Sequence, residues 1–152
     1  LQFAGDVAAN VATKIRGANI RFNPRFPESG MQIKIDAELI RTALYNIIDN
    51  AIEACIETPG TTEHRIDFIV EIGQERLTFV VQDTGGGMSR EAMGSAFDLF
   101  TSTKGQRGTG IGLYVTRKIV QKHGGTIDVQ SDPGKGSRFE IALPFESAGD
   151  AA

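Results

Sequence analysis

The sequence lacks the features that tie a protein to a membrane, to nucleic acid or to an oxidising compartment. No apolar run approaches the roughly 18 residues that a membrane-spanning helix needs. The net charge of -3 provides no basic excess to attract nucleic acid or an anionic lipid surface. A single cysteine, Cys55, cannot form an internal disulfide, which fits a reducing compartment. We therefore expect a cytoplasmic domain with no nucleic-acid partner and no membrane contact of its own.

The length of the chain suits one domain. Its 152 residues suffice to bury a hydrophobic core, and no internal repeat or second domain is apparent. The chain begins at Leu1 with neither an initiator methionine nor a secretory signal, so we expect a fragment of a longer protein. Residues 1–146 are expected to form the domain and residues 147–152 a flexible tail. Whether the longer protein is anchored to a membrane is left open.

Two familiar phosphate-binding patterns, the Walker loop and the dinucleotide fingerprint, are also absent. Glycines are instead dense between Asp83 and Leu113, where the chain reads DTGGGM, FDLFTSTKG and QRGTGIGL. Because glycine is costly to order, this density indicates unusual dihedrals or a close approach of the backbone to another group. Gly108, Gly110 and Gly112 precede a helical pattern, so backbone N–H groups there are suited to face an anion. This stretch predicts a nucleotide site of another class, although glycine-rich loops without a ligand are common.

Hydrophobic periodicity predicts an α+β fold. Helices of the observed length, together with apolar-faced hairpins, indicate a two-layer α/β sandwich. About three helices are expected to cover one face of a mixed, mostly antiparallel sheet of about five strands. The predicted helices span residues 6–16, 36–57 and 111–123, and the predicted strands span residues 18–22, 66–72, 77–82, 126–131 and 137–143.

The helix over residues 36–57 is the strongest in the chain, with Asp36 as a suitable N-cap. Cys55 lies on its apolar stripe, so we interpret it as a core residue rather than a reactive thiol. Asn46 and Asn50 share a polar face and offer neutral amide oxygens, which suit Mg²⁺ when a phosphate supplies the negative charge. Alone, they would indicate an ordinary hydrated helix face, but the glycine loops favour a metal-nucleotide site. The predicted polar face comprises Thr42, Asn46, Asp49, Asn50 and Glu53.

Four motifs follow one another in order: Asn46–Ala54, Asp83–Met88, Phe97–Phe100 with Thr103 and Lys104, and Gly108–Leu113. They resemble the N box, first glycine box, F box and second glycine box of the ATP-binding domain of sensor histidine kinases. That domain belongs to the superfamily that also contains gyrase, heat-shock chaperone and mismatch-repair ATPases. The resemblance covers nearly the whole chain, and it extends to HGG at residues 123–125 and GKGSRF at residues 134–139.

The resemblance implies a site for ATP and Mg²⁺. Asp83 would accept the exocyclic amine of adenine, which favours adenine over guanine. Gly85 and Gly87 would let the backbone close around the base. Asn50 would bind Mg²⁺, and Asn46 would support the phosphates as a catalytic residue.

The same resemblance implies a phosphate-side lid. Lys104 is the candidate for neutralising charge on the γ-phosphate, with a solvated loop lysine as the alternative, whereas Arg107 is interpreted as solvated. The F box departs from the family at Leu99 and Thr101, and the loop from Lys104 to Gly108 is short, as in the nitrogen-regulatory type of kinase. The lid and the helix start would be formed by Thr103, Lys104, Gly108, Thr109, Gly110, Ile111, Gly112 and Leu113.

The resemblance also bears on the phosphate acceptor. Gyrase-like ATPases carry a water-activating glutamate at the position of Asn46, and an amide is a poor base, so transfer is favoured over hydrolysis. In sensor kinases the acceptor is a histidine on a separate dimerisation domain. His64 lies in a polar connection, and His123 ends a helix where a partly positive imidazole suits the dipole; neither fits that role. Partners are therefore expected to be a histidine-bearing dimerisation domain and a downstream response regulator, with this domain itself a monomer.

Two alternatives stay open. A protein-serine kinase of the anti-sigma-factor type shares these motifs and is usually a stand-alone domain. A regulatory module that binds a nucleotide or a partner without transfer activity would also retain the binding residues. The role of Glu53 is unassigned.

Overall fold

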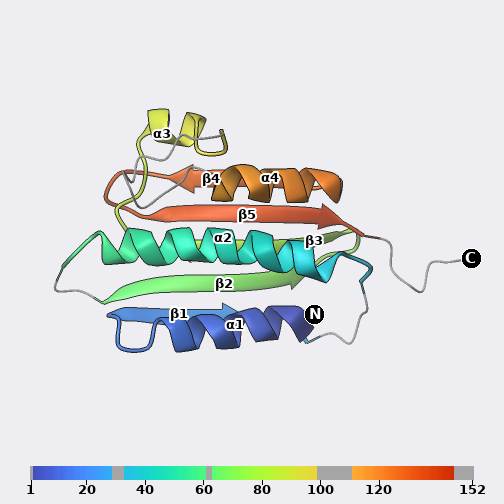
Figure 1. The fold of residues 1–152 in the computed structure, drawn as a ribbon, viewed down its shortest axis with the longest axis horizontal. Helices are drawn as coiled ribbons and strands as arrows, with labels where there is room; N and C mark the ends of the chain where they lie inside the picture. The colour runs from blue at the N-terminus through green and yellow to red at the C-terminus, as the bar shows by residue number, and fades with distance from the viewer. Residues whose placement is uncertain (1, 29–32, 61–62, 99–110, 146–152) are drawn as a thin grey trace, which may run out of the picture.

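The computed structural model describes residues 2–28, 33–60, 63–98 and 111–145. Within these ranges, four helices and five strands alternate in an α+β order (Figure 1). The elements are α1 (Gln2–Lys14), β1 (Ile20–Arg25), α2 (Ala37–Ile56), β2 (His64–Ile72), β3 (Arg76–Asp83), α3 (Arg90–Gly94), α4 (Gly112–Lys122), β4 (Thr126–Ser131) and β5 (Ser137–Pro144).

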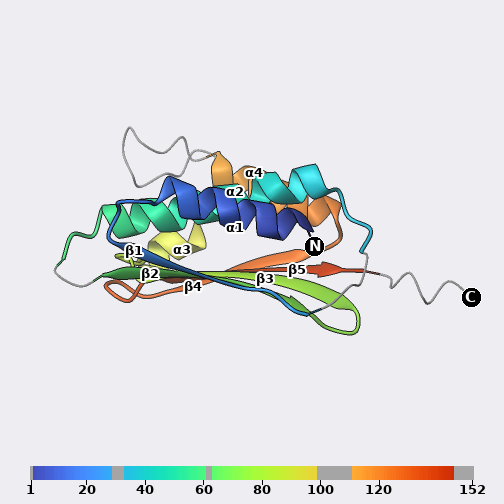
Figure 2. The same cartoon turned by 90° about the horizontal axis from the view of Figure 1, so that it is seen from below.

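The five strands form one sheet in the order β1-β2-β3-β5-β4. β1 pairs with β2 in parallel, and the other three pairings are antiparallel, including both predicted hairpins. Figure 2 shows α1, α2 and α4 stacked on one face of this sheet. The predicted two-layer architecture with a mixed, mostly antiparallel sheet is confirmed.

Alternation along the strands separates a core face from a solvent face. On β5, Phe139, Ile141 and Leu143 are buried toward the helices. Arg138 and Glu140 point to the opposite face and form an ion pair at 2.9 Å. Because successive strand residues point to opposite faces, β5 presents these charged side chains on the side of the sheet away from the helices.

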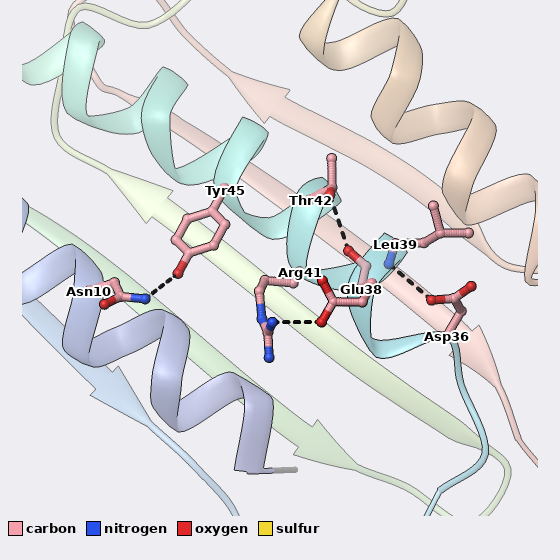
Figure 3. Close-up of polar contacts among 7 residues, drawn as sticks. All are labelled: Asn10, Asp36, Glu38, Leu39, Arg41, Thr42 and Tyr45. Carbon is pink, nitrogen blue, oxygen red and sulfur yellow. Dashed lines mark hydrogen bonds and ion pairs between the residues drawn. The ribbon is translucent and has the colours of Figure 1, made fainter.

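α2 is the central helix of the covering layer and lies between α1 and α4 (Figure 1). Ile40, Leu44 and Ile48 are completely buried against the sheet. Figure 3 shows the polar contacts that hold the first half of this helix. The Asp36 carboxylate accepts a hydrogen bond from the Leu39 N–H at 3.2 Å, which confirms the predicted N-cap. Asn10 of α1 donates to the Tyr45 hydroxyl at 2.8 Å.

Three features of the fold differ from the prediction by more than the shift of an element end by one or two residues. β1 was expected to end before Pro24, but it continues to Arg25, with Pro24 opposite Phe68. β1 lies at the edge of the sheet, so the missing N–H of proline costs no pairing there. α1 begins before Asp6 because Phe3 packs into the core, 6.1 Å from the ring of Phe79. The short α3 was not predicted; Ser89 caps it by accepting from the Ala92 N–H at 3.1 Å.

Candidate functional site

The N-box helix and the second glycine box meet at Asn46. The Asn46 side-chain amide donates to the Gly112 carbonyl at 3.2 Å and to the Thr116 hydroxyl at 3.3 Å. Thr116 is fully buried on α4, and its hydroxyl also donates to the Gly112 carbonyl, at 2.8 Å. Two predicted motifs that lie 66 residues apart in sequence are therefore in direct contact.

The predicted polar face of α2 is divided between its two neighbours. Asn46 contacts α4, whereas the Asp49 carboxylate forms an ion pair with Lys14 of α1 at 2.5 Å. The Asn46 side-chain nitrogen donates its hydrogen bonds toward α4. The side-chain oxygen, the acceptor of the amide, therefore points in a different direction. Asn50 lies one helical turn further on and is half-buried. The side of α2 that carries Asn46 and Asn50 therefore combines amide oxygens with the start of α4.

Asp83 ends β3 with a buried carboxylate. Only 3% of the residue is exposed, on the helix-facing side of the strand. One carboxylate oxygen accepts a hydrogen bond from the Gly85 N–H at 2.8 Å, which fixes the orientation of the group. A buried carboxylate needs such hydrogen bonds because removing it from water is costly.

Cys55 lies behind this carboxylate in the core. It is 2% exposed, as expected for a core residue. Burial, and then the negative charge of Asp83, raise the pKa of the thiol from 9.0 to about 11. A thiol with this pKa is protonated and poorly nucleophilic at neutral pH.

The first glycine box is packed tightly against protein on both sides. A Cβ on Gly85 would lie 2.7 Å from the Ala54 backbone of α2, which is too close for any side chain. Gly87 has a φ of 70°, and a Cβ there would overlap the Asp132 carbonyl in the turn between β4 and β5. The described structure thus gives these glycines a packing reason: they let the loop fit between α2 and the C-terminal hairpin.

The turn between β4 and β5 supports this loop, a role that sequence reasoning missed. Gly136 has a φ of 83°, and a Cβ there would overlap the Asp83 carbonyl. The Gly134 N–H donates to the Gly86 carbonyl at 2.7 Å. The Ser131 hydroxyl accepts from the Met88 N–H at 2.7 Å. The two glycines of this turn were the available signal, but only the pairing of distant strands shows what they contact.

The two histidines occupy opposite ends of α2. His64 is the first residue of β2, and its ring contacts the Thr58 carbonyl at 2.6 Å and the Thr84 hydroxyl at 3.0 Å. His123 is the C-cap of α4, as predicted. Its Nε2 accepts from the Asp36 N–H at 3.2 Å, and its Nδ1 donates to the Ile119 carbonyl at 2.9 Å. The His123 ring thus bridges the first turn of α2 and the last turn of α4.

The start of α4 is only partly described. No described side chain caps the helix at Ile111, which leaves first-turn N–H groups for another acceptor. A Cβ on Gly112 would lie an ordinary 3.7 Å from Asn46, so this contact alone does not require glycine. Leu113 packs against the core. Several predicted residues lie outside the described ranges, namely Leu99, Thr101, Thr103, Lys104, Arg107, Gly108, Thr109 and Gly110.

The amide oxygens on α2 suit a cation that is coordinated by phosphate oxygens as well as by the protein, rather than one that is bound by acidic side chains alone. Among the described residues, no three His, Cys, Asp or Glu side chains gather as a metal site. Amide oxygens such as those of Asn46 and Asn50 suit Mg²⁺ when phosphate oxygens and water complete its shell. The same ranges contain no helix that is long and apolar enough to cross a bilayer.

The described residues thus bring together a helix-covered mixed sheet, a buried aspartate at the end of β3 and a tightly packed glycine loop beside α2. Residues 35–147 match the family model described as Histidine kinase-, DNA gyrase B-, and HSP90-like ATPase, and the chain belongs to this family.

Curated relatives are sensor kinases. Sensor histidine kinase ZraS of Klebsiella oxytoca is 39% identical over 113 residues, which cover 74% of this chain and 23% of that protein. Adaptive-response sensory kinase SasA of Synechococcus sp. (strain JA-2-3B'a(2-13)) is 34% identical over 134 residues, which cover 86% of this chain and 34% of that protein. The chain therefore spans a third or less of the length of these multidomain relatives.

Solved structures agree with the sequence relatives. The nucleotide-free catalytic domain of histidine kinase ThkA has a TM-score of 0.79 and 29% identity, covering 94% of this chain and 92% of that one. Full-length ShkA in complex with AMPPNP has a TM-score of 0.82 at 24% identity and covers 97% of this chain and 30% of that one, which shows the shared fold. The predicted kinship with the ATP-binding catalytic domain of sensor histidine kinases is confirmed.

Proposed function

We propose that this chain is the catalytic module of a longer sensor kinase, with residues 1–146 as the domain and residues 147–152 as its tail. It binds Mg-ATP and donates the γ-phosphate to a histidine on a separate dimerisation domain, from which a response regulator takes the phosphate. One observation carries the proposal: the Asn46 amide is hydrogen-bonded to Gly112 and Thr116, so the N box lies directly against the start of α4.

Adenine is recognised by Asp83 in this proposal. The carboxylate is buried at 3% exposure and is held by the Gly85 N–H, so it needs no reorganisation to accept a hydrogen bond. An acceptor at this point favours the amine of adenine over the carbonyl of guanine. Gly85 and Gly87 keep the backbone of the loop close to α2 and to the C-terminal hairpin, which leaves the base edge to the Asp83 side chain.

The phosphates are held from the other side. Asn50 supplies an amide oxygen to Mg²⁺, and Asn46 supports the phosphates while it anchors α4. The N-terminus of α4, which no side chain within the described ranges caps, offers N–H groups to a phosphate oxygen. The lid residues assigned to the phosphates are Thr103, Lys104, Gly108, Thr109, Gly110, Ile111, Gly112 and Leu113.

The absence of a base at Asn46 supports transfer over hydrolysis. An amide accepts no proton at neutral pH, and the Asn46 nitrogen is already engaged by α4. Phosphoryl transfer depends mainly on positioning and on charge neutralisation, which this arrangement supplies without a base for water.

Calorimetric titration with a non-hydrolysable ATP analogue and Mg²⁺ tests the binding half of the proposal. We expect adenine-selective binding, with a GTP analogue much weaker. Asp83→Asn places an amide donor opposite the adenine amine and should cost about 1 to 3 kcal/mol of binding free energy. Equal affinity for the two analogues, or for wild type and the folded variant, would remove Asp83 from the site. Transfer is tested by incubating a longer form that includes the dimerisation domain with γ-labelled ATP; a folded protein that takes no label would contradict it.

A further inference from the structure

We propose that His64 is a positioning residue for the adenine-binding end of the site. It joins Thr58, just beyond the C-terminal end of α2, to Thr84 and thereby fixes the backbone that orients the Asp83 carboxylate. The inference rests on the proposed function, since it assumes that Asp83 receives the adenine amine. His64 itself does not need to touch the nucleotide.

The ring of His64 bridges two segments that are distant in sequence. Its Nε2 lies 2.6 Å from the Thr58 carbonyl, just beyond the C-terminal end of α2. Its Nδ1 lies 3.0 Å from the Thr84 hydroxyl and 3.1 Å from the Thr84 carbonyl. The backbone of His64 is fixed independently, because its N–H donates to the Asn19 carbonyl at 3.0 Å. The imidazole is therefore held by the backbone of β2 and contacts both Thr58 and Thr84.

The hydrogen bonds around this ring form a complete set. A carbonyl oxygen only accepts, so Nε2 donates to Thr58. Nδ1 lies within hydrogen-bond distance of both the Thr84 hydroxyl and the Thr84 carbonyl, and the same hydroxyl oxygen accepts from the Arg65 N–H at 2.9 Å. The Thr84 N–H donates to the Arg65 carbonyl at 3.1 Å. Both ring nitrogens and the Thr84 hydroxyl thus have partners, as in polar networks that order their members.

The contact between His64 and Thr84 affects Asp83 through Gly85. Gly85 follows Thr84 directly, and its N–H donates to the Asp83 carboxylate at 2.8 Å. Gly85 packs so closely on Ala54 that a Cβ would lie 2.7 Å from it. The Thr58 hydroxyl donates to the Ala54 carbonyl at 2.8 Å. A displacement of Thr84 would therefore turn the Gly85 N–H and, with it, the carboxylate.

His123 provides the matched control. It also bridges two backbone groups at an end of α2, but at the opposite end, between Asp36 and Ile119. Replacing His123 removes two side-chain contacts, against three for His64, and touches neither Thr84 nor Gly85. An effect that is specific to His64 is therefore an effect of its place beside the glycine loop.

The experiment is titration of the full chain with Mg²⁺ and non-hydrolysable ATP, and separately with ADP, for wild type, His64→Ala and His123→Ala. Unfolding temperatures are measured in parallel, and binding is compared where each variant is folded. We expect His64→Ala to weaken both nucleotides by the same factor, on the order of fivefold to tenfold, as for one lost oriented hydrogen bond. His123→Ala should lower the unfolding temperature and leave both affinities within about twofold.

A double-mutant cycle with Asp83→Asn separates positioning from general loosening. In the Asp83→Asn background, His64→Ala should cost almost no further affinity, because the group that it positions is already changed. An unchanged affinity of His64→Ala, an equal loss in His123→Ala, or a loss that simply adds to that of Asp83→Asn would each overturn the inference. A folded wild type that binds neither nucleotide would instead remove the proposed function, and this inference with it.

Two conservative variants carry the test if His64→Ala does not fold. Asparagine keeps a polar atom near the position of Nδ1, beside Thr84, whereas glutamine extends toward the position of Nε2 and Thr58. Because Thr84 is the link to Gly85, we expect His64→Asn to retain more affinity than His64→Gln. The reverse order would show that the Thr84 contact does not position the site.

Discussion

The two ends of α2 are held by similar chemistry for different purposes. At the N-terminal end, the Asp36 carboxylate caps the first turn of α2. The Asp36 N–H donates a hydrogen bond to Nε2 of the His123 ring. At the C-terminal end, His64 contacts the Thr58 carbonyl. The His123 ring joins the N-terminal end of α2 to α4, whereas the His64 ring joins the C-terminal end to the loop that holds the Asp83 carboxylate. A helix end with ordinary hydrogen-bonding contacts can thus also hold in place a loop to which we assign a role in nucleotide binding.

Gly85→Ala should produce the largest difference between the two ends. The added methyl group would lie 2.7 Å from Ala54, so α2 and the glycine loop must separate. We expect a loss of about 1 to 3 kcal/mol in the free energy of unfolding, as for an overpacked core, together with a marked loss of ATP affinity. Denaturant unfolding and nucleotide titration measure the two effects.

Gly5→Ala is the matched control for this variant. Gly5 lies in α1, where a Cβ would meet nothing within 4 Å, so alanine should stabilise the helix by about 0.5 to 1 kcal/mol. Comparable behaviour of the two variants would mean that the contact between Gly85 and Ala54 does not constrain the site.

Cys55 makes the C-terminal end sensitive to alkaline pH. Burial and the Asp83 charge raise the pKa of the thiol from 9.0 to about 11, so the unfolded chain releases this proton at a lower pH than the folded protein. The unfolded state therefore binds fewer protons between these values, and the free energy of unfolding falls as the pH rises through this window. Below 9.0 the thiol is protonated in both states, and its effect on stability is independent of pH.

Cys55→Ala isolates this contribution from other groups that titrate in the same range. Urea unfolding at about pH 8 and about pH 10 should show a larger loss of stability in wild type than in the variant. Identical losses in the two proteins would contradict the assigned cause.

Asp36→Ala should have the smallest effect and should be confined to stability. It removes the acceptor for the Leu39 N–H, and loss of such a cap typically costs about 1 kcal/mol. Because Asp36 lies at the end of α2 remote from the glycine loop, the affinity for an ATP analogue should be unchanged. A variant that lost affinity as well as stability would erase the distinction between the two ends.

The sequence predicted the residues whose position follows from local periodicity. Asn46 and Cys55 were assigned to opposite sides of one helix, and Asp83 to the end of a strand, because these patterns repeat within a few residues. Their burial and contacts agree with that assignment. Gly85 was singled out because glycines are dense in this stretch of the sequence, but its close contact with Ala54 was not predicted.

What the sequence did not predict depends on contacts between distant segments. Asp49, which was predicted to lie on the polar face with Asn46, instead pairs with Lys14, 35 residues away in sequence. The His64 ring contacts Thr84, 20 residues away in sequence. Pro24 was expected to end a strand, which is correct for an interior strand but not for β1 at the sheet edge. Periodicity carries no information on which elements become neighbours, so these features required the assembled fold.

The strand order has a consequence for biosynthesis. β5, the last strand in sequence among the described elements, is inserted between β3 and β4, so β3 has an open edge until the C-terminal hairpin has been made. The same hairpin supplies Gly136, which packs on the Asp83 carbonyl. While this hairpin is still inside the ribosome, a nascent chain therefore exposes the β3 edge, which a chaperone or a second chain can occupy. Nucleotide binding would thus report that translation of the domain is complete.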